Sequence, residues 1–343
     1  MSQDQKSTRR LASRLNWETI LAVLLVIAIA GGGFLNQDFL TPENWSNLLA
    51  NFIEIALLAL PLSLIVITKE IDLSVASILG LSSSLLGLLW ESKVSMPLGI
   101  LVCLLVGAAA GALNGFLVVG FGLPSLAVTI GTLALFRGFA YVLLGDKAIA
   151  DFPAEYTGFG IGTIPNTFIP SPFALFIILA IVFWLILHHT TVGRRIYAVG
   201  GNQTAALFSG VNIGRLKILL FIASGAISAL AGIIYTLRFS SSRADNGTGF
   251  ELSAIAAVIL GGVTVQGGRG TITGVVFSLL LIGILNNVLT LADVANEILR
   301  IVTGSLLIVS VLLPNLIASA RERWRVRQRL KEIAKIETVS AAK

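Results

Sequence analysis

The feature that most constrains this chain is a series of long apolar runs separated by short polar segments. Of its 343 residues, 55% are hydrophobic and 12% are charged, whereas an ordinary globular domain is about one quarter charged. Runs of this length are typical of segments that cross a bilayer, where the backbone must satisfy its own hydrogen bonds. The sequence therefore predicts an all-α, polytopic membrane protein, because the residue alternation typical of a membrane β-barrel is absent.

The apolar runs predict roughly ten transmembrane helices. We expect them at 17–35, 47–67, 75–90, 97–119, 125–144, 172–189, 218–237, 252–265, 272–291 and 296–317. Two places are irregular. The charged break at 68–74 is either a cytoplasmic loop or a helix interruption at membrane depth, and the run 252–265 is short for a span and is expected to be a short or discontinuous helix.

Positive charge is concentrated in three parts of the sequence, which sets the expected topology. Basic loops and tails of membrane proteins lie predominantly in the cytoplasm. We therefore expect residues 1–16 to be a cytoplasmic tail, 17–318 to be the transmembrane domain with a cytoplasmic segment at 190–217, and 319–343 to be a basic cytoplasmic tail. Topology accounts for these charges better than nucleic-acid binding does, so we expect no nucleic-acid partner.

The polar run from Gly193 to Gly210 stands apart because it separates two long apolar runs. Asn202 is a good helix N-cap, Ala205 and Ala206 favour helix, and Gly210 can end one. The spacing predicts a short helix within 202–210. A short helix on the cytoplasmic face is a part that a partner protein can push.

Motifs of catalysis are missing from the sequence. There is no phosphate-binding loop with the Gly-x-x-x-x-Gly-Lys-Ser/Thr pattern. His188 and His189 are adjacent and lack the spacing of a zinc site, so they are interpreted as polar residues at the membrane interface. The lone Cys103 is interpreted as a packing residue, and Gly158–Gly162 as a flexible turn. We expect no enzyme activity, no metal and no cofactor.

Several polar side chains fall inside the predicted spans, where they either line a solute path or join neighbouring helices. An interhelical hydrogen bond contributes about 1 kcal/mol, and an arginine near a helix end can also extend toward the interface. Neutral polar groups suit a neutral, hydroxyl-rich solute better than an ion. The candidate path residues are Asn114, Thr129, Thr132, Arg137, Asn286 and Asn287.

The polar run carries a pattern that resembles the cytoplasmic motif of the permease subunits of sugar-type ABC importers, the ribose, xylose, rhamnose and autoinducer-2 branch. The matching residues are Gly193, Arg194, Tyr197, Gly200, Gly201, Asn202, Ala205, Ala206, Ser209 and Gly210. In that family the resemblance implies a segment that couples the permease to an ATPase.

Three further stretches resemble the same family, in the same order along the chain. They are Ile71–Val75, with Asp72 and Ser74; the pieces 114–115, 128–132 and 137–138; and the glycine-rich signature 261–274, with Gly261, Gly262, Gly267, Gly268, Gly270 and Gly274. The resemblance covers about 45–315. The chain departs from the family where Lys69-Glu70 replaces a glycine pair and Ala76 replaces a glycine.

The resemblance implies the transmembrane subunit of a binding-protein-dependent importer that carries a monosaccharide or related polyol across the bacterial inner membrane, with both termini cytoplasmic. Its implied partners are a cytoplasmic ABC ATPase, a periplasmic solute-binding protein and a second permease chain, identical or homologous. The outer loops 36–46, 145–171 and 238–251 are expected to meet the binding protein. The alternative function is a secondary transporter or passive facilitator that works without an ATPase.

Overall fold

The computed structural model describes residues 17–294, together with 298, 301, 304–305 and 308, and within these residues it contains thirteen α-helices, one 3₁₀ helix and no β-strand. The all-α prediction is confirmed for this part of the chain. The elements are α2 (Trp17–Leu35), η1 (Gln37–Leu40), α3 (Pro42–Asn51), α4 (Ile53–Ile67), α5 (Val75–Glu91), α6 (Met96–Gly120), α7 (Ser125–Leu144), α8 (Ala154–Ile161), α9 (Ser171–His189), α10 (Thr191–Gly201), α11 (Gln203–Phe208), α12 (Ile213–Phe239), α13 (Phe250–Leu260) and α14 (Ile272–Leu291).

The predicted count of roughly ten spans is not confirmed. Six described helices are long and apolar enough to cross a membrane, namely α2, α6, α7, α9, α12 and α14, and a seventh span results if α3 and α4 are counted as one. Helices α5 and α13 have only 17 and 11 residues. The predicted span 296–317 lies largely outside the described residues.

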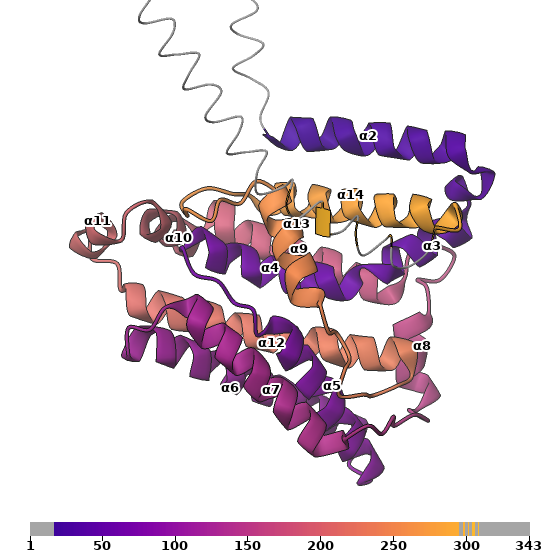
Figure 1. The fold of residues 1–343 in the computed structure, drawn as a ribbon, viewed down its shortest axis with the longest axis horizontal. Coiled ribbons are helices and arrows are strands. Elements are labelled where there is room, and N and C mark those ends of the chain that lie inside the picture. The colour runs from indigo at the N-terminus through magenta and orange to yellow at the C-terminus, as the bar shows by residue number, and fades with distance from the viewer. Residues whose placement is uncertain (1–16, 295–297, 299–300, 302–303, 306–307, 309–343) are drawn as a thin grey trace, which may run out of the picture.

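Helix α4 forms the centre of the bundle. Fourteen of its fifteen residues are buried, as expected for a helix that is apolar on every side. It packs against α12, α13 and α9, and Figure 1 places it between α12 and the pair α13–α14. Any movement of α4 must therefore be shared by the helices that enclose it.

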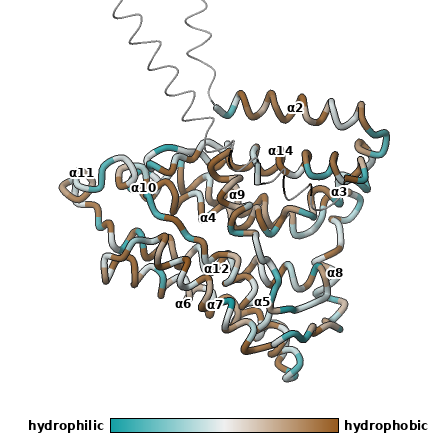
Figure 2. Tube along the Cα trace, in the orientation of Figure 1, coloured by the Kyte–Doolittle hydropathy of each residue, from teal (hydrophilic) through white to brown (hydrophobic). Residues whose placement is uncertain are grey.

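Helix α2 lies at the edge of the bundle, where it contacts chiefly α14 (Figure 1). Val26 and Ile27 are 65% and 60% exposed, and Figure 2 shows hydrophobic residues along the whole helix. A helix so apolar and so exposed is suited to a lipid environment. Trp17 anchors its first turn, because the indole Nε1 donates a hydrogen bond to the Leu260 carbonyl at 2.8 Å.

Helices α6 and α12 make the most extensive contact in the fold, through the strip of Gly107, Gly111 and Gly115 on α6. A Cβ atom on Gly111 would lie 2.1 Å from the Phe221 carbonyl oxygen, and one on Gly107 would lie 2.5 Å from that of Gly225. The two backbones thus approach as closely as only small residues allow.

Two predicted segments differ from the structure. The expected helix 47–67 is bent by 46° between α3 and α4, because Arg238 inserts a guanidinium that bonds the Ala50 carbonyl oxygen and the Asn51 side chain. The predicted turn at 158–162 is largely helical, since Gly158–Ile161 belong to α8. Gly160 lets α8 approach α12, as its Cβ would lie 2.6 Å from the Arg238 amide nitrogen.

We predict that Gly111→Ala destabilises the protein whereas Gly131→Ala, on the exposed side of α7, does not. The methyl group at 111 has no room, and such overpacking costs about 1–3 kcal/mol, more than alanine gains over glycine in a helix. No heavy atom lies within 4 Å of a Cβ on Gly131. Thermal unfolding of the two variants in detergent checks this, and equal melting temperatures would contradict it.

Candidate functional site

The segment between α9 and α12 folds into two short helices. Thr190 caps α10, because its hydroxyl accepts hydrogen bonds from the amides of Val192 and Gly193. Asn202 caps α11 by accepting from the Ala205 amide at 3.0 Å, and Gly210, with φ of +80°, follows its end. The predicted short helix within 202–210 is confirmed, whereas the helix α10 over 191–201 was not predicted from the sequence.

Helix α10 is amphipathic, and its glycines allow close contact with the neighbouring elements. Arg194 and Arg195 are exposed, whereas Ile196 and Val199 are buried. A Cβ on Gly193 would lie 1.9 Å from the Leu187 carbonyl oxygen, so only glycine permits the tight turn from α9 into α10.

The buried face of α10 meets the end of α4 at Gly200. A Cβ on Gly200 would lie 1.8 Å from the Ile67 carbonyl oxygen and 2.4 Å from the Gly268 amide nitrogen, and that amide donates to Ile67 at 2.9 Å. Close by, the Tyr197 hydroxyl donates to the Gly270 carbonyl at 2.7 Å. We name these five residues the glycine junction; it joins α10, the last residue of α4 and the loop before α14.

The Tyr197 hydroxyl can donate its hydrogen bond in this junction only while it is protonated. Burial raises its pKa above the ordinary tyrosine value, and the Glu18 carboxylate raises it further. The phenol therefore stays neutral across the physiological range and holds the loop at Gly270.

The exposed side of the segment carries two apolar side chains that are not part of the family motif. Leu207 and Phe208 are 59% and 87% exposed, while Ala206 is buried. Two large apolar residues in an otherwise polar run were the signal that could have identified them. Gly201, predicted together with Gly200, has no atom near the position of a Cβ.

The glycine-rich signature forms a turn between α13 and α14. A Cβ on Gly274 would lie 2.1 Å from the Gly261 carbonyl oxygen, so these two glycines allow the helices to meet. Gly262, Gly267 and Gly268 have φ of +89°, +79° and +73°, a region open to glycine with little strain. Gly270 adopts φ of +140°. Helix α13 therefore ends at Leu260, and the predicted run 252–265 is shorter than expected.

The break at 68–74 is a buried polar centre. The Asp72 side chain is inaccessible and accepts hydrogen bonds from the Ser74 amide at 3.0 Å, the Ser74 hydroxyl at 2.6 Å and the Ser224 hydroxyl at 2.8 Å. Asn114 donates to the Ser74 hydroxyl at 2.8 Å. Because Asn114 lies six residues before the end of α6, about 9 Å along its axis, this geometry favours an interruption at depth over a surface loop.

The same break contains the residues that replace the family's glycine pair. Lys69 adopts φ of +69°, a left-handed conformation that glycine reaches more easily. Glu70 pairs with Lys217 of α12 at an oxygen–nitrogen distance of 2.5 Å, and both side chains are 12% exposed. The chain thus keeps the backbone turn without glycine and adds an ion pair to α12.

The six candidate path residues do not form one site. Asn114 and Thr129 lie at the break, where the Thr129 hydroxyl contacts the Ser125 and Ile71 carbonyls. Thr132 lies one turn further along α7, where its hydroxyl contacts the Thr129 carbonyl of the same helix at 3.5 Å. Asn287 instead forms two reciprocal hydrogen bonds with Asn44, at 2.8 and 3.0 Å. Asn286 has a buried side-chain oxygen without a partner among the described residues, and Arg137 binds a different loop altogether.

Comparison with known proteins decides the family. Residues 44–311 match the family described as branched-chain amino acid transport system / permease component. The autoinducer 2 import system permease proteins LsrD of Escherichia coli K12 and Shigella flexneri are each 38% identical to this chain over 304 residues, which are 87% of this chain and 92% of the relative. No solved structure matches the chain. The chain belongs to this permease family.

Because its relatives are permease proteins of import systems, the permease is a transport subunit and not an enzyme. ATP hydrolysis in such importers belongs to a separate subunit. The sequence-based assignment to the permeases of ABC importers is therefore confirmed, and the facilitator alternative loses its support.

We predict that Ser224→Ala lowers the stability of the permease by about 1–3 kcal/mol, the range for leaving a buried polar partner unsatisfied. The variant removes one of three donors from the buried Asp72 carboxylate. Ser228→Ala, one turn further along α12, is the matched control, because its buried hydroxyl has no partner among the described residues. If thermal unfolding is shifted equally in both variants, the Ser224 hydrogen bond is not what stabilises the break.

Proposed function

We propose that residues 190–217 are the cytoplasmic coupling segment through which a separate ABC ATPase drives the transmembrane bundle. The residues of the family motif in this segment are Gly193, Arg194, Tyr197, Gly200, Gly201, Asn202, Ala205, Ala206, Ser209 and Gly210. In this proposal 1–16 and 319–343 are cytoplasmic tails and 17–318 is the permease domain of an inner-membrane protein.

The single observation that carries the proposal is the close approach at the glycine junction. Gly200 leaves no space between α10 and the Ile67 carbonyl oxygen. Ile67 ends α4, which is buried along nearly its whole length. A displacement of α10 therefore acts on the central helix without an intervening flexible side chain, and packed helices respond by moving as units.

The partner contact is assigned to α11. Leu207 and Phe208 present apolar surface, while Arg194 and Arg195 supply positive charge on the neighbouring helix. An exposed aromatic residue next to a hydrophobic neighbour is the kind of anchor that fills a pocket on a partner. We assign that pocket to the ATPase subunit.

The solute is proposed to be small, neutral and rich in hydroxyl groups. The relatives import autoinducer 2 by their names, which makes it the first solute to test; a monosaccharide or polyol is the next. Asn114 and Thr129 contact the interruption before α5 and Thr132 lies one turn from Thr129, and transporters bind solutes at such discontinuous helices. Arg137 and Asn287 bind other partners, and Asn286 is assigned no part in solute binding.

The remaining partners follow from the proposed importer. A periplasmic solute-binding protein would meet the end of the bundle opposite α11, where the loops 36–46, 145–171 and 238–251 lie. A second permease chain, identical or homologous, would complete the path. The positive charge of the tails and of the coupling segment supports a cytoplasmic location for both termini.

We predict that Gly200→Val abolishes uptake while the permease still inserts into the membrane. The valine side chain would separate α10 from α4, so ATPase movement would no longer reach the bundle. Uptake of autoinducer 2 by host cells that carry the variant in place of the wild-type chain is the measurement, with the amount of permease in isolated membranes as the check on insertion.

Gly201→Val is the matched control, since it adds the same side chain one residue later where no atom lies within 4 Å. We expect it to retain most of the uptake. Normal uptake by Gly200→Val would refute the coupling role of the junction. Equal loss in both variants would show that bulk anywhere in this turn is harmful and that Gly200 has no special place in it.

A further inference from the structure

The loop between α12 and α13 does not remain at the surface. Ser242, Ala244 and Asn246 are 0%, 2% and 7% exposed, although the sequence predicts an outer loop here. A Cβ on Gly87 would lie 2.4 Å from the Ser242 hydroxyl, and one on Gly80 would lie 2.9 Å from the Asn246 carbonyl oxygen. Gly87 and Gly80 lie about 6 Å and 16 Å before the end of α5, so the loop descends beside this helix.

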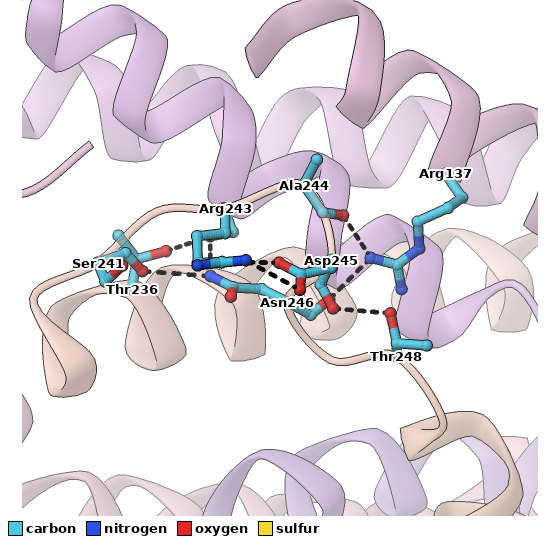
Figure 3. Close-up of polar contacts among 9 residues, drawn as sticks. Arg137, Thr236, Ser241, Arg243, Ala244, Asp245, Asn246 and Thr248 are labelled. Carbon is cyan, nitrogen blue, oxygen red and sulfur yellow. Dashed lines mark hydrogen bonds and ion pairs between the residues drawn. The ribbon is translucent and has the colours of Figure 1, made fainter. Parts of the chain in front are cut away.

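Backbone that enters a bundle needs donors for its carbonyl groups. Arg137 supplies them from α7 (Figure 3): Nη1 donates to the Ala244 carbonyl at 2.6 Å and the Asn246 carbonyl at 2.9 Å. Its Nη2 donates to the Ala76 carbonyl of α5 at 3.1 Å. The guanidinium thus joins the loop to α5 and forms no ion pair with a described carboxylate.

The loop is also hydrogen-bonded to a pair of hydroxyl groups between α5 and α12. The Asn246 amide donates to the Ser83 hydroxyl at 2.8 Å, which shares a hydrogen bond of 2.7 Å with Thr236. The Ser242 hydroxyl donates to the Ser83 carbonyl at 2.7 Å, and the Ser242 and Ile149 backbones exchange two hydrogen bonds. Ser242, Ala244 and Asn246 are therefore each bonded to a helix of the bundle or to the neighbouring loop.

The other side of the loop faces outward. Arg243 and Asp245 are about half exposed and pair at 2.9 Å. The Arg243 hydrogen bond lowers the pKa of Asp245 below its usual range, so the pair is ionised at neutral pH. These two residues, with Tyr141 and Lys147, line a pocket at this end of the bundle.

We propose that residues 240–249 are a plug that closes this end of the bundle, and that Arg137 is the positioning residue that latches it. The plug lies at the end of α12 opposite the coupling segment, about 40 Å away along that 27-residue helix. The proposal depends on the proposed importer function in one respect: it takes this end of the bundle as the one through which solute enters. Two of the three Arg137 hydrogen bonds end on the plug and the third ends on α5, so this one side chain joins the plug to both α7 and α5.

Hydrogen–deuterium exchange of the 240–249 amides in the full-length permease tests the latch without any transport assay. Gly80→Ala is one variant, because its methyl group would lie 2.3 Å from Arg137 Nη1 and 2.9 Å from the Asn246 carbonyl oxygen and would separate the guanidinium from the carbonyl that it binds. We expect exchange in 240–249 to become at least tenfold faster while α6 and α12 keep their protection. Arg137→Lys, which has one donor group instead of a fork, should give the same pattern.

Two matched controls separate the latch from general damage. Gly138→Ala places a methyl group beside Arg137 on α7 where no atom lies within 4 Å, and Arg243→Gln breaks the exposed ion pair of the same loop. Neither should change exchange in 240–249 by more than about twofold.

Two outcomes overturn the proposal. Unchanged exchange of 240–249 in both Gly80→Ala and Arg137→Lys would show that Arg137 does not hold the loop. Faster exchange spread over α5, α7 and α12, with a lower melting temperature, would show that Arg137 supports the whole fold and latches nothing. Either result would leave the importer function standing, because uptake is measured separately.

Discussion

The architecture depends on how closely backbones can approach one another. In a lipid environment apolar contact does not favour helix–helix over helix–lipid packing, so close packing and hydrogen bonds hold a bundle together. Glycine provides this at several contacts of the described chain, among them those between α6 and α12 at Gly111, between α13 and α14 at Gly261 and Gly274, and between α10 and α4 at Gly200. Through the third contact, the proposed coupling segment packs directly against the end of the central helix α4.

Two buried polar centres lie toward opposite ends of the fold. Near the end that carries the proposed coupling segment, Asp72 accepts hydrogen bonds from Ser74, which directly precedes α5, and from Ser224 of α12. At the other end, Arg137 donates to carbonyls of the 240–249 plug and of α5. Each centre stabilises an interruption next to a short helix, α5 or α13, and each charge is met by neutral dipoles. Bonds of this kind can be exchanged for others more readily than a close-packed apolar core can be rebuilt.

Much of the fold follows from the sequence, because apolar length and helix-ending residues are local signals. The limits of α7 and α14 agree with the prediction, and Asn202 caps α11 as expected. The site follows less well, because its partners are distant in sequence. Nothing near Arg137 indicates that its guanidinium meets carbonyls more than 100 residues later. Gly200 and Gly201 cannot be distinguished from the sequence, because they differ only in the atoms that surround them in the fold.

The most direct test of the account is to isolate the tagged permease from native membranes under mild solubilisation and identify the bound proteins by mass spectrometry. We expect an ABC ATPase to be bound to the wild-type chain and lost from Phe208→Asp, which places a charge on the 87% exposed anchor of α11. Ile161→Asp, 70% exposed on α8 and outside the helices long enough to cross a membrane, controls for a charge on an apolar surface. Absence of an ATPase from the wild-type chain, or its full retention by Phe208→Asp, would contradict the proposed coupling.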